Sequence, residues 1–297
     1  MTKNTFVIVT WNNENQIGQL LKSIEEFEPE SDVILVDNNS ADNTVSVAKR
    51  DSKKVSIIEM NDNFGFAKAN NIGVEKAKTE YITLINPDTK LTESFVDVFS
   101  KKMDVASNIG MIGAKLINSD GSLQSSIFNF QNPVNIIIEQ FRLGKLMPEY
   151  LKRKYSPELS KHDICQSIDW IMGAFMFTRK DYYSRVGGFS EDYFLYAEDM
   201  DICYKYHLIN KKILFDPSII VEHVGGASEK QTNSRKSLKL LESFCIFANK
   251  YDYKLNIRTL YECYRLKYIL AKVLLFNDKT LLEKYRKNIL FLKEKLS

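Results

Sequence analysis

The chain has 297 residues, of which 44% are hydrophobic and 27% charged, with 12 Gly and 6 Pro. This ordinary composition excludes disordered and fibrous proteins, and the length suits one large α/β domain or a domain with an appendage. The net charge of +3 conceals a basic tail, residues 257–297, in which ten Lys and Arg face four acids, while the first 256 residues sum to −3. We expect no nucleic-acid partner, because the basic charge is confined to this tail.

The first half of the chain alternates short apolar strands with amphipathic helices. The pattern predicts strands at 6–10, 33–36, 55–60 and 81–85, and helices at 16–27, after residue 42 and at 67–78. Strands that alternate with helices of about a dozen residues predict a parallel sheet with right-handed crossovers.

The second half is less regular. The pattern predicts strands at 111–118, 170–178, 212–215 and 219–221, and helices at 181–186, 197–209, 237–251 and 257–296. The segment 131–165 contains Pro133, Pro148 and Pro157 without clear periodicity, so we expect an irregular insertion with some helix at 134–141.

The predicted strand Tyr81–Ile85 stops at Asn86-Pro87, because proline cannot donate a hydrogen bond to a ladder. Asp88 is therefore expected on a turn at the carboxyl edge of the sheet, where ligands bind in open α/β proteins. A carboxylate there suits a divalent cation such as Mg²⁺. The alternative is a solvated turn residue.

Polar segments follow three of the predicted strands, namely Thr10-Trp11-Asn12, Asp37-Asn38-Asn39 and Asn86-Pro87-Asp88. In a parallel sheet they share one edge and form one polar crevice that could hold a base and a ribose. The sequence has neither a Gly-x-Gly-x-x-Gly after the first strand nor a P-loop. Bound phosphates would therefore need a metal ion.

The four cysteines are far apart, which indicates thiols in a reducing compartment and not a zinc site or a disulfide framework. No signal-peptide core and no apolar run of about 20 residues is visible. We expect a cytoplasmic protein.

Several blocks follow one another in a characteristic order: Asp37–Thr44, Asn63–Gly73, Asn86–Asp88, Trp170–Ala174, Val186–Phe189, Tyr193–Cys203 and His223–Gly226. Over about residues 5–230 they resemble family-2 glycosyltransferases, specifically the rhamnosyltransferase-like branch. The resemblance implies a GT-A fold, which is a Rossmann-like, mostly parallel sheet flanked by helices. It also implies a nucleotide-sugar donor, Mg²⁺ or Mn²⁺, and inversion at the anomeric carbon.

Carried over by position, the resemblance implies a nucleotide-sugar site made of Thr10, Trp11, Asp37, Asn39, Asn63, Gly65, Lys68, Asn70, Asn86, Asp88 and Gly173. Asp88 matches the metal-binding carboxylate of the family's Asp-x-Asp motif, and His223 would complete the metal shell. The first Asp of that motif is Asn86 here, so one negative charge near the cation is missing.

The resemblance places the general base at Asp199, with Glu198 supporting it or contacting the acceptor. Trp170 and Tyr196 are the other predicted acceptor-side residues, and the aromatic residues Tyr193, Phe194 and Tyr196 could form an apolar wall or a sugar platform. The alternative for the acidic pair is structural, since acids in a first helical turn favour the helix dipole.

We expect a GT-A catalytic domain at 1–230, with a nucleotide-sugar-binding half at 1–118 and an acceptor-side half at 119–230. A C-terminal helical extension would follow at 231–297. Its basic amphipathic part, 257–297, is expected either to touch the inner face of a membrane peripherally or to pack on the catalytic domain or on a second copy in a homodimer.

The expected function is that of an inverting hexosyltransferase in surface polysaccharide and cell-wall biosynthesis, acting on a glycan or lipid-linked saccharide. The resemblance alone favours dTDP-rhamnose as the donor. A UDP-hexose donor and an inactive sugar-nucleotide-binding or scaffold protein remain alternatives. A sugar-1-phosphate nucleotidyltransferase is disfavoured, because its Gly-rich basic loop after the first strand is missing.

Overall fold

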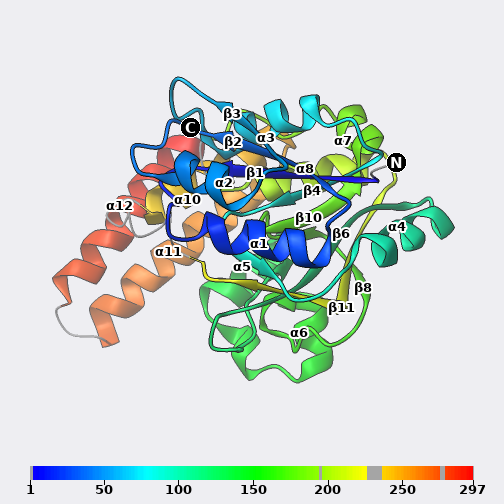
Figure 1. Cartoon of the computed structure of the whole chain (residues 1–297). Coiled ribbons are helices and arrows are strands. Elements are labelled where there is room, and N and C mark those ends of the chain that lie inside the picture. The colour runs from blue at the N-terminus through cyan, green and yellow to red at the C-terminus, as the bar shows by residue number, and fades with distance from the viewer. Residues whose placement is uncertain (1–2, 194–195, 226–235, 275–277, 297) are drawn as a thin grey trace. The chain divides into compact units, whose positions relative to one another are not determined.

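The computed structural model describes residues 3–193, 196–225, 236–274 and 278–296 (Figure 1). By its internal contacts the chain divides into two units. The first unit contains Met1–Phe128 and Lys161–Asn233, and the second contains Asn129–Ser160 and Ser234–Ser297. The segment 129–160, which lies within the predicted acceptor-side half, thus groups with the C-terminal helices.

A nine-stranded sheet forms the centre of the first unit, in the order β3-β2-β1-β4-β10-β6-β11-β5, with β8 paired to β11. The strands are β1 (Asn4–Thr10), β2 (Asp32–Asp37), β3 (Val55–Glu59), β4 (Tyr81–Ile85), β5 (Thr89–Leu91), β6 (Ile109–Ile117), β8 (Gln166–Ile168), β10 (Phe175–Arg179) and β11 (Lys212–His223). Only β5, β8 and β10 run against the other strands of this sheet. The predicted mostly parallel α/β architecture is confirmed.

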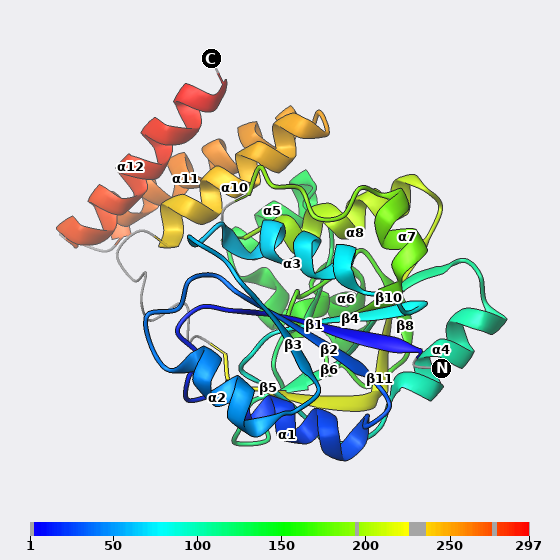
Figure 2. The same cartoon turned by 45° about the horizontal axis from the view of Figure 1, so that its top comes forward.

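Helices cover both faces of this sheet (Figure 2). They are α1 (Ile17–Phe27), α2 (Thr44–Asp51), α3 (Gly65–Lys76), α4 (Val96–Val105), α7 (Lys180–Arg185) and α8 (Glu198–Leu208). On one face, Phe6 and Phe175 pack with Phe95 and Phe99 at the start of α4. On the other face, a Cβ on Gly73 would lie 2.5 Å from Val7 Cγ1, so glycine lets α3 approach β1.

The predicted strand at 170–178 is wrong, because the chain breaks into β9 (Trp170–Ile171) and β10. β9 pairs with β7 (Ile127–Phe128) in a separate two-stranded sheet. Between β9 and β10, the N–H groups of Met172 and Gly173 donate to Ser126 O and to Asp199. The bond of Met172 continues the pairing of β9 with β7, whereas the N–H of Gly173 bonds to a side chain, so the ladder ends there.

The two short strands predicted at 212–215 and 219–221 form one strand, β11. Its register against β6 shifts between Asp216 and Ile220, around Pro217, which has no N–H to donate. The side chain of Asp216 accepts the N–H of Ser218 at 3.1 Å.

The second unit is helical, with α5 (Pro133–Gln140), η1 (Leu143–Leu146), α6 (Glu149–Tyr155), η2 (Pro157–Leu159), α10 (Lys236–Lys250), α11 (Lys254–Leu274) and α12 (Lys279–Leu296). Asn132 caps α5 by accepting the N–H of Asn135 at 3.0 Å. Ile136 of α5 packs with Ile257 and Leu260 of α11 and Leu292 of α12. The helix predicted at 257–296 is therefore two helices, and 131–165 contains more helix than expected.

Candidate active site

The first two polar segments meet at the carboxyl ends of β1 and β2. Thr10 Oγ1 donates to Asp37 Oδ1 at 2.8 Å, and the N–H of Ser40 donates to Asp37 Oδ2 at 2.8 Å. Asp37 is 3% exposed, and these two bonds use its carboxylate to hold the loop that follows β2 in place. Asn39 in this loop adopts a positive φ of 62°, which Asn tolerates better than most residues.

The loop after β2 contacts the start of α3. Asn38 Nδ2 donates to Gly65 O at 3.1 Å, and the N–H of Gly65 donates to Asn63 Oδ1 at 3.0 Å. Gly65 has a φ of 84°, a conformation that favours glycine. Asn38 Oδ1 is buried and has no hydrogen-bond partner among the described residues. These contacts join the Asp37 and Asn63 motifs into one site.

Asp88 lies directly after β4 on the predicted turn, where the N–H of Thr89 donates to Asn86 O. His223 ends β11 and pairs with Thr89 of β5. Asp88 Oδ1 and His223 Nε2 lie 3.2 Å apart, and Asn86 Nδ2 lies 3.5 Å from the same nitrogen. Both Asp88 and His223 are buried. The turn and the strand thus place two potential metal-binding atoms, Asp88 Oδ1 and His223 Nε2, next to each other.

This pair fits a hexacoordinate divalent cation. Ligands that sit about 2.0–2.1 Å from an octahedral ion are about 3 Å from their neighbours, which matches the separation of Asp88 Oδ1 and His223 Nε2. The carboxylate of Asp88 suits Mg²⁺ or Mn²⁺. Among the described residues no third His, Cys, Asp or Glu joins the pair in a metal-binding group. The remaining ligands would be donor phosphates and water.

Glu198 and Asp199 begin α8, as predicted, but their surroundings differ. Asp199 accepts the N–H of Gly173 at 3.2 Å and that of Met200 at 2.9 Å, whereas buried Glu198 Oε2 has no hydrogen-bond partner in the described part of the chain. Burial raises the pKa of Asp199, and the two N–H donors oppose this shift. Burial, and then the charge of Asp199, raise the pKa of Glu198 further. Asp199 is therefore the carboxyl that ionises first.

A third acid in the first turn of α8 has a structural role. Asp201 is fully buried and accepts hydrogen bonds from Ser190 Oγ at 2.6 Å and Tyr193 OH at 3.1 Å. It therefore anchors the segment before α8. The helix-dipole explanation suits Asp199, which accepts the first-turn N–H of Met200, but it does not account for Glu198, whose Oε2 is buried without a partner among the described residues.

One dipeptide connects the acidic pair with the candidate metal ligands. The N–H of Gly173 donates to Asp199, and the carbonyl oxygen of the next residue, Ala174, accepts the N–H of Asn86 at 3.1 Å. Consecutive Cα atoms are about 3.8 Å apart, so the two residues that bond Asp199 and Asn86 are direct neighbours in space as well as in sequence. A Cβ on Gly173 would lie 3.5 Å from the ring of Phe66, which brings the start of α3 to the same place.

Some predicted site residues have local partners instead. Lys68 Nζ lies 4.2 Å from the ring centroid of Phe64, and Asn70 Nδ2 donates to Phe66 O at 2.9 Å. The N–H of Trp11 donates to Asn13 Oδ1. The ligand-binding roles of Lys68, Asn70 and Trp11 stay predictions.

The acceptor-side aromatic residues are partly accounted for. Trp170 stacks on Phe128 with 4.2 Å between ring centroids, and Tyr196 has a φ of 72° just before α8. Phe194 and Gly226, which belong to the blocks quoted above, lie outside the described residues. The acceptor roles of Trp170 and Tyr196 stay predictions.

Three residues at the site were not predicted. Asn38 and Phe66 belong to recognised blocks, but nothing in their spacing distinguished them from their neighbours. Gln124, whose Oε1 lies 2.6 Å from His223 Nδ1, is 99 residues away in sequence, so no local pattern could have indicated it.

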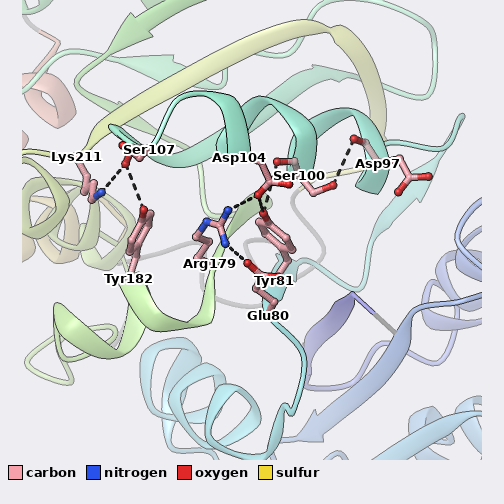
Figure 3. Close-up of polar contacts among 9 residues, drawn as sticks. All are labelled: Glu80, Tyr81, Asp97, Ser100, Asp104, Ser107, Arg179, Tyr182 and Lys211. Carbon is pink, nitrogen blue, oxygen red and sulfur yellow. Dashed lines mark hydrogen bonds and ion pairs between the residues drawn. The ribbon is translucent and has the colours of Figure 1, made fainter. Parts of the chain in front are cut away.

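A polar cluster at the opposite edge of the sheet has a structural role. Tyr81 OH donates to Asp104 Oδ1 at 2.5 Å, and Arg179 pairs with both Asp104 and Glu80, which ties together β4, α4 and β10 (Figure 3). The surface cavity beside it has a volume of about 600 Å³ and contains none of the predicted site residues. Because Arg179 bonds to both nearby acids, this cluster stabilises the fold.

Known protein families and sequences include relatives of this chain. Over residues 5–215, more than half of the chain, the sequence matches the family model described as Glycosyl transferase family 2. It is 24% identical over 217 residues to the N-acetylglucosaminyl-diphospho-decaprenol L-rhamnosyltransferase of Mycobacterium tuberculosis, which covers 66% of this chain and 67% of that protein. It is 23% identical over 233 residues to rhamnosyltransferase WbbL of Escherichia coli, covering 73% and 81%.

Solved structures show the same fold. The mannosyltransferase PcManGT from Pyrobaculum calidifontis, in complex with GDP-Man and Mn²⁺, matches with a TM-score of 0.60 at 15% identity, covering 99% of this chain and 85% of that one. TarS of S. aureus matches with a TM-score of 0.53 at 16% identity, and the match covers 97% of this chain but 43% of TarS. The likeness confirms the predicted GT-A fold. With the family match, it shows that this chain belongs to glycosyl transferase family 2 and is a glycosyltransferase.

Proposed function

We propose that this glycosyltransferase moves a sugar, with inversion, from a nucleotide-sugar donor to a glycan or lipid-linked saccharide. The observation that carries the proposal is the Gly173-Ala174 dipeptide, which bonds Asp199 on one side and Asn86 on the other. An acceptor hydroxyl beside Asp199 would thereby lie close to a sugar whose diphosphate faces Asp88 and His223. An in-line displacement needs this juxtaposition of base and leaving group.

Asp199 has the properties of a general base. Its pKa is raised by burial, so its carboxylate is a stronger proton acceptor than an exposed one, and the N–H groups of Gly173 and Met200 hold it in place. Glu198 keeps its proton at neutral pH and can donate a hydrogen bond to an acceptor oxygen from Oε2. Asp88 and His223 would hold Mg²⁺ or Mn²⁺, which neutralises charge on the departing diphosphate.

The small size of Gly173 also supports a ligand at this position. The φ of Gly173 is not positive, and an added Cβ would make only ordinary contacts of 3.5 Å with Phe66 and Asp199. The surrounding protein therefore does not require glycine here. A donor sugar close to the backbone would require it.

We propose dTDP-rhamnose as the donor, because two relatives are rhamnosyltransferases by name. The PcManGT structure contains GDP-Man, so the GT-A fold accepts other nucleotide sugars and a UDP-hexose stays the alternative. The name of the Mycobacterium relative contains a decaprenol-linked saccharide, which supports a lipid-linked acceptor for this chain as well. We therefore propose a role in surface polysaccharide and cell-wall biosynthesis at the cytoplasmic side of the membrane.

The test is transfer with purified protein, Mn²⁺ and a panel of dTDP-, UDP- and GDP-sugars. The acceptor is a synthetic N-acetylglucosaminyl-diphospho-prenol, chosen from the substrate in the Mycobacterium relative's name. We expect mass spectrometry to show one added deoxyhexose from dTDP-rhamnose, and NMR of the product to show an inverted anomeric centre. Turnover of a UDP-hexose alone would replace the donor assignment. Nucleotide binding without turnover of any donor would support the inactive binding protein.

We further propose that the second unit contacts an anionic membrane through α11. Leu266, Ile269, Leu270 and Val273 recur at helical spacing and are all exposed, and Val273 reaches 63%. The exposed cations of α11 share this helix with the apolar stripe: Lys254, Arg258, Arg265 and Lys272. An apolar stripe with cations on one helix fits the interface of an anionic bilayer. None of the described helices is long and apolar enough to cross a membrane.

Vesicle flotation tests this contact. The wild type is expected to float with phosphatidylglycerol-containing vesicles but not with pure phosphatidylcholine, and Leu266→Ser/Ile269→Ser/Val273→Ser should stay at the bottom of the gradient. Val105→Ser on α4 is the matched control, since Val105 is 82% exposed but lies in the first unit. A wild-type dimer that the triple variant converts to a monomer, without flotation of either, would show instead that the stripe is a homodimer interface.

A further inference from the structure

The imidazole of His223 is held from behind by a residue outside every recognised block. Gln124 Oε1 lies 2.6 Å from His223 Nδ1, while Nε2 of the same ring faces Asp88 Oδ1 at 3.2 Å. Which ring nitrogen carries the proton therefore decides whether Nε2 can offer a lone pair to a cation. The neighbours of Gln124 determine this through a chain of hydrogen bonds.

The chain of hydrogen bonds begins at a group that can only accept. The Asp120 carboxylate accepts Ser122 Oγ at 2.6 Å and the N–H of Ser122 at 2.9 Å, and these bonds hold the pKa of Asp120 below its usual value. Because the Ser122 hydroxyl proton points at Asp120, Ser122 Oγ must accept from Asn118 Nδ2, 2.8 Å away. This orients the Asn118 amide with Oδ1 toward Gln124.

The orientation then passes to the histidine. Asn118 Oδ1 accepts from Gln124 Nε2 at 3.0 Å, and His223 O accepts from the same Nε2 at 3.4 Å. Gln124 Oε1 is therefore the atom that faces the ring, and an amide oxygen can only accept. His223 Nδ1 must therefore carry a proton. In the neutral ring this leaves Nε2 without a proton, and its lone pair faces the side of Asp88 Oδ1.

We propose that the turn from Asn118 to Gln124, here called the relay, fixes His223 in its Nδ1–H tautomer and so prepares Nε2 as a metal ligand. Gln124 is a positioning residue in this scheme, because it acts only through His223. The proposal rests on the metal role of Asp88 and His223 in the proposed function. It adds the residues that orient the ligand, which in metal sites commonly contribute 10- to 100-fold in affinity.

Backbone contacts keep Gln124 in position. Its N–H donates to Leu116 O at 3.0 Å, at the end of β6. A Cβ on Gly225 would lie 3.1 Å from Gln124 Nε2, and Gly225 has a φ of 67°. Glycine at 225 therefore leaves room for the Gln124 amide and supplies the left-handed turn after β11.

The tautomer is measured directly by long-range ¹H–¹⁵N correlation NMR on metal-free protein at about pH 8, where imidazoles are mostly neutral. The chain has three histidines, and His223→Gln assigns the signals of His223. We expect the Nδ1–H pattern in the wild type and a shift toward Nε2–H in Gln124→Leu, where Asp88 becomes the remaining acceptor. An unchanged tautomer in Gln124→Leu would overturn the proposal, whether or not the protein transfers sugar.

A double-mutant cycle on Mn²⁺ binding tests the consequence. Proton relaxation enhancement with Mn²⁺ alone is expected to show a 10- to 100-fold loss of affinity for Gln124→Leu. In a His223→Ala background the same substitution should cost nothing more, since its target is gone. Leu123→Ala is the neighbouring control and should bind as the wild type does. Equal losses of Mn²⁺ affinity in both backgrounds would refute a relay through His223. Failure of the wild type to bind Mn²⁺ would contradict the metal role in the proposed function, but it would not change the tautomer result.

Discussion

Asp199→Asn is expected to lower the rate of sugar transfer by about 100- to 10,000-fold, the usual contribution of a general base. Asp199 accepts the N–H of Gly173 at Oδ2 and that of Met200 at Oδ1, so Asn, which has one acceptor oxygen, keeps one of these two bonds. Donor binding should persist, because the proposed role of Asp199 is toward the acceptor hydroxyl. The wild-type rate should fall as the pH drops through the raised pKa of Asp199, about 6, because the protonated carboxyl cannot accept a proton. Single-turnover transfer and donor binding by calorimetry measure these two effects separately.

The same substitution is expected to remove the pH dependence of stability that comes from the raised pKa of Asp199. A carboxyl whose folded pKa exceeds its unfolded value binds more protons when folded, so the wild type loses stability as pH rises above about 4. Asn carries no charge and escapes this loss. In urea denaturation, the stability of the variant relative to the wild type should therefore rise from pH ~4 to pH 8.

Asp201→Asn is the matched control for both effects. Asp201 lies two residues away but accepts hydrogen bonds from Ser190 and Tyr193, so its substitution should destabilise the protein at neutral pH. Asp199→Asn that transfers sugar at the wild-type rate would refute the base assignment. An Asp199→Asn variant whose stability falls between pH ~4 and pH 8 as much as that of the wild type would show that Asp199 does not have a raised pKa.

Asp88→Ala is expected to lower metal-dependent transfer by roughly 1,000-fold, because a metal ion supplies several kcal/mol of charge stabilisation to the departing diphosphate. Mn²⁺ affinity should fall with it. Asp88 is buried beside His223, so circular dichroism must first show that the variant is folded.

Asn86→Asp provides the opposite change at the same turn. It restores the missing first carboxylate of the family's Asp-x-Asp motif, at a position whose Nδ2 lies 3.5 Å from His223 Nε2. This added carboxylate should tighten Mn²⁺ binding by roughly tenfold, or about 1.4 kcal/mol. A folded Asp88→Ala variant with unchanged Mn²⁺ affinity and rate would remove Asp88 from the metal site. An Asn86→Asp variant with weaker binding would show that the amide of Asn86 has its own role.

The sequence by itself determined the elements that depend on local chemistry. Pro87 must end β4, and Asp88 therefore lies on the turn that follows. The alternation of strands and helices in the first half predicted the parallel part of the sheet, since short apolar runs and helical spacing reflect which faces become buried. The order of the sequence blocks was enough to identify the family, because it needs no contact between distant residues.

Only the tertiary structure decided how distant hydrogen-bonding groups pair. Three acids begin α8 in one turn, yet burial and the partners Ser190 and Tyr193 make Asp201 structural, while Asp199 is held by Gly173, 26 residues away. Gln124 reaches His223 across 99 residues. The strand predicted at 170–178 breaks for the same reason, because its first part pairs with β7 and the N–H of Gly173 then bonds to the side chain of Asp199 instead of continuing a ladder. Local pattern fixes which residues are buried, but the partner of a buried polar group is set by the fold as a whole.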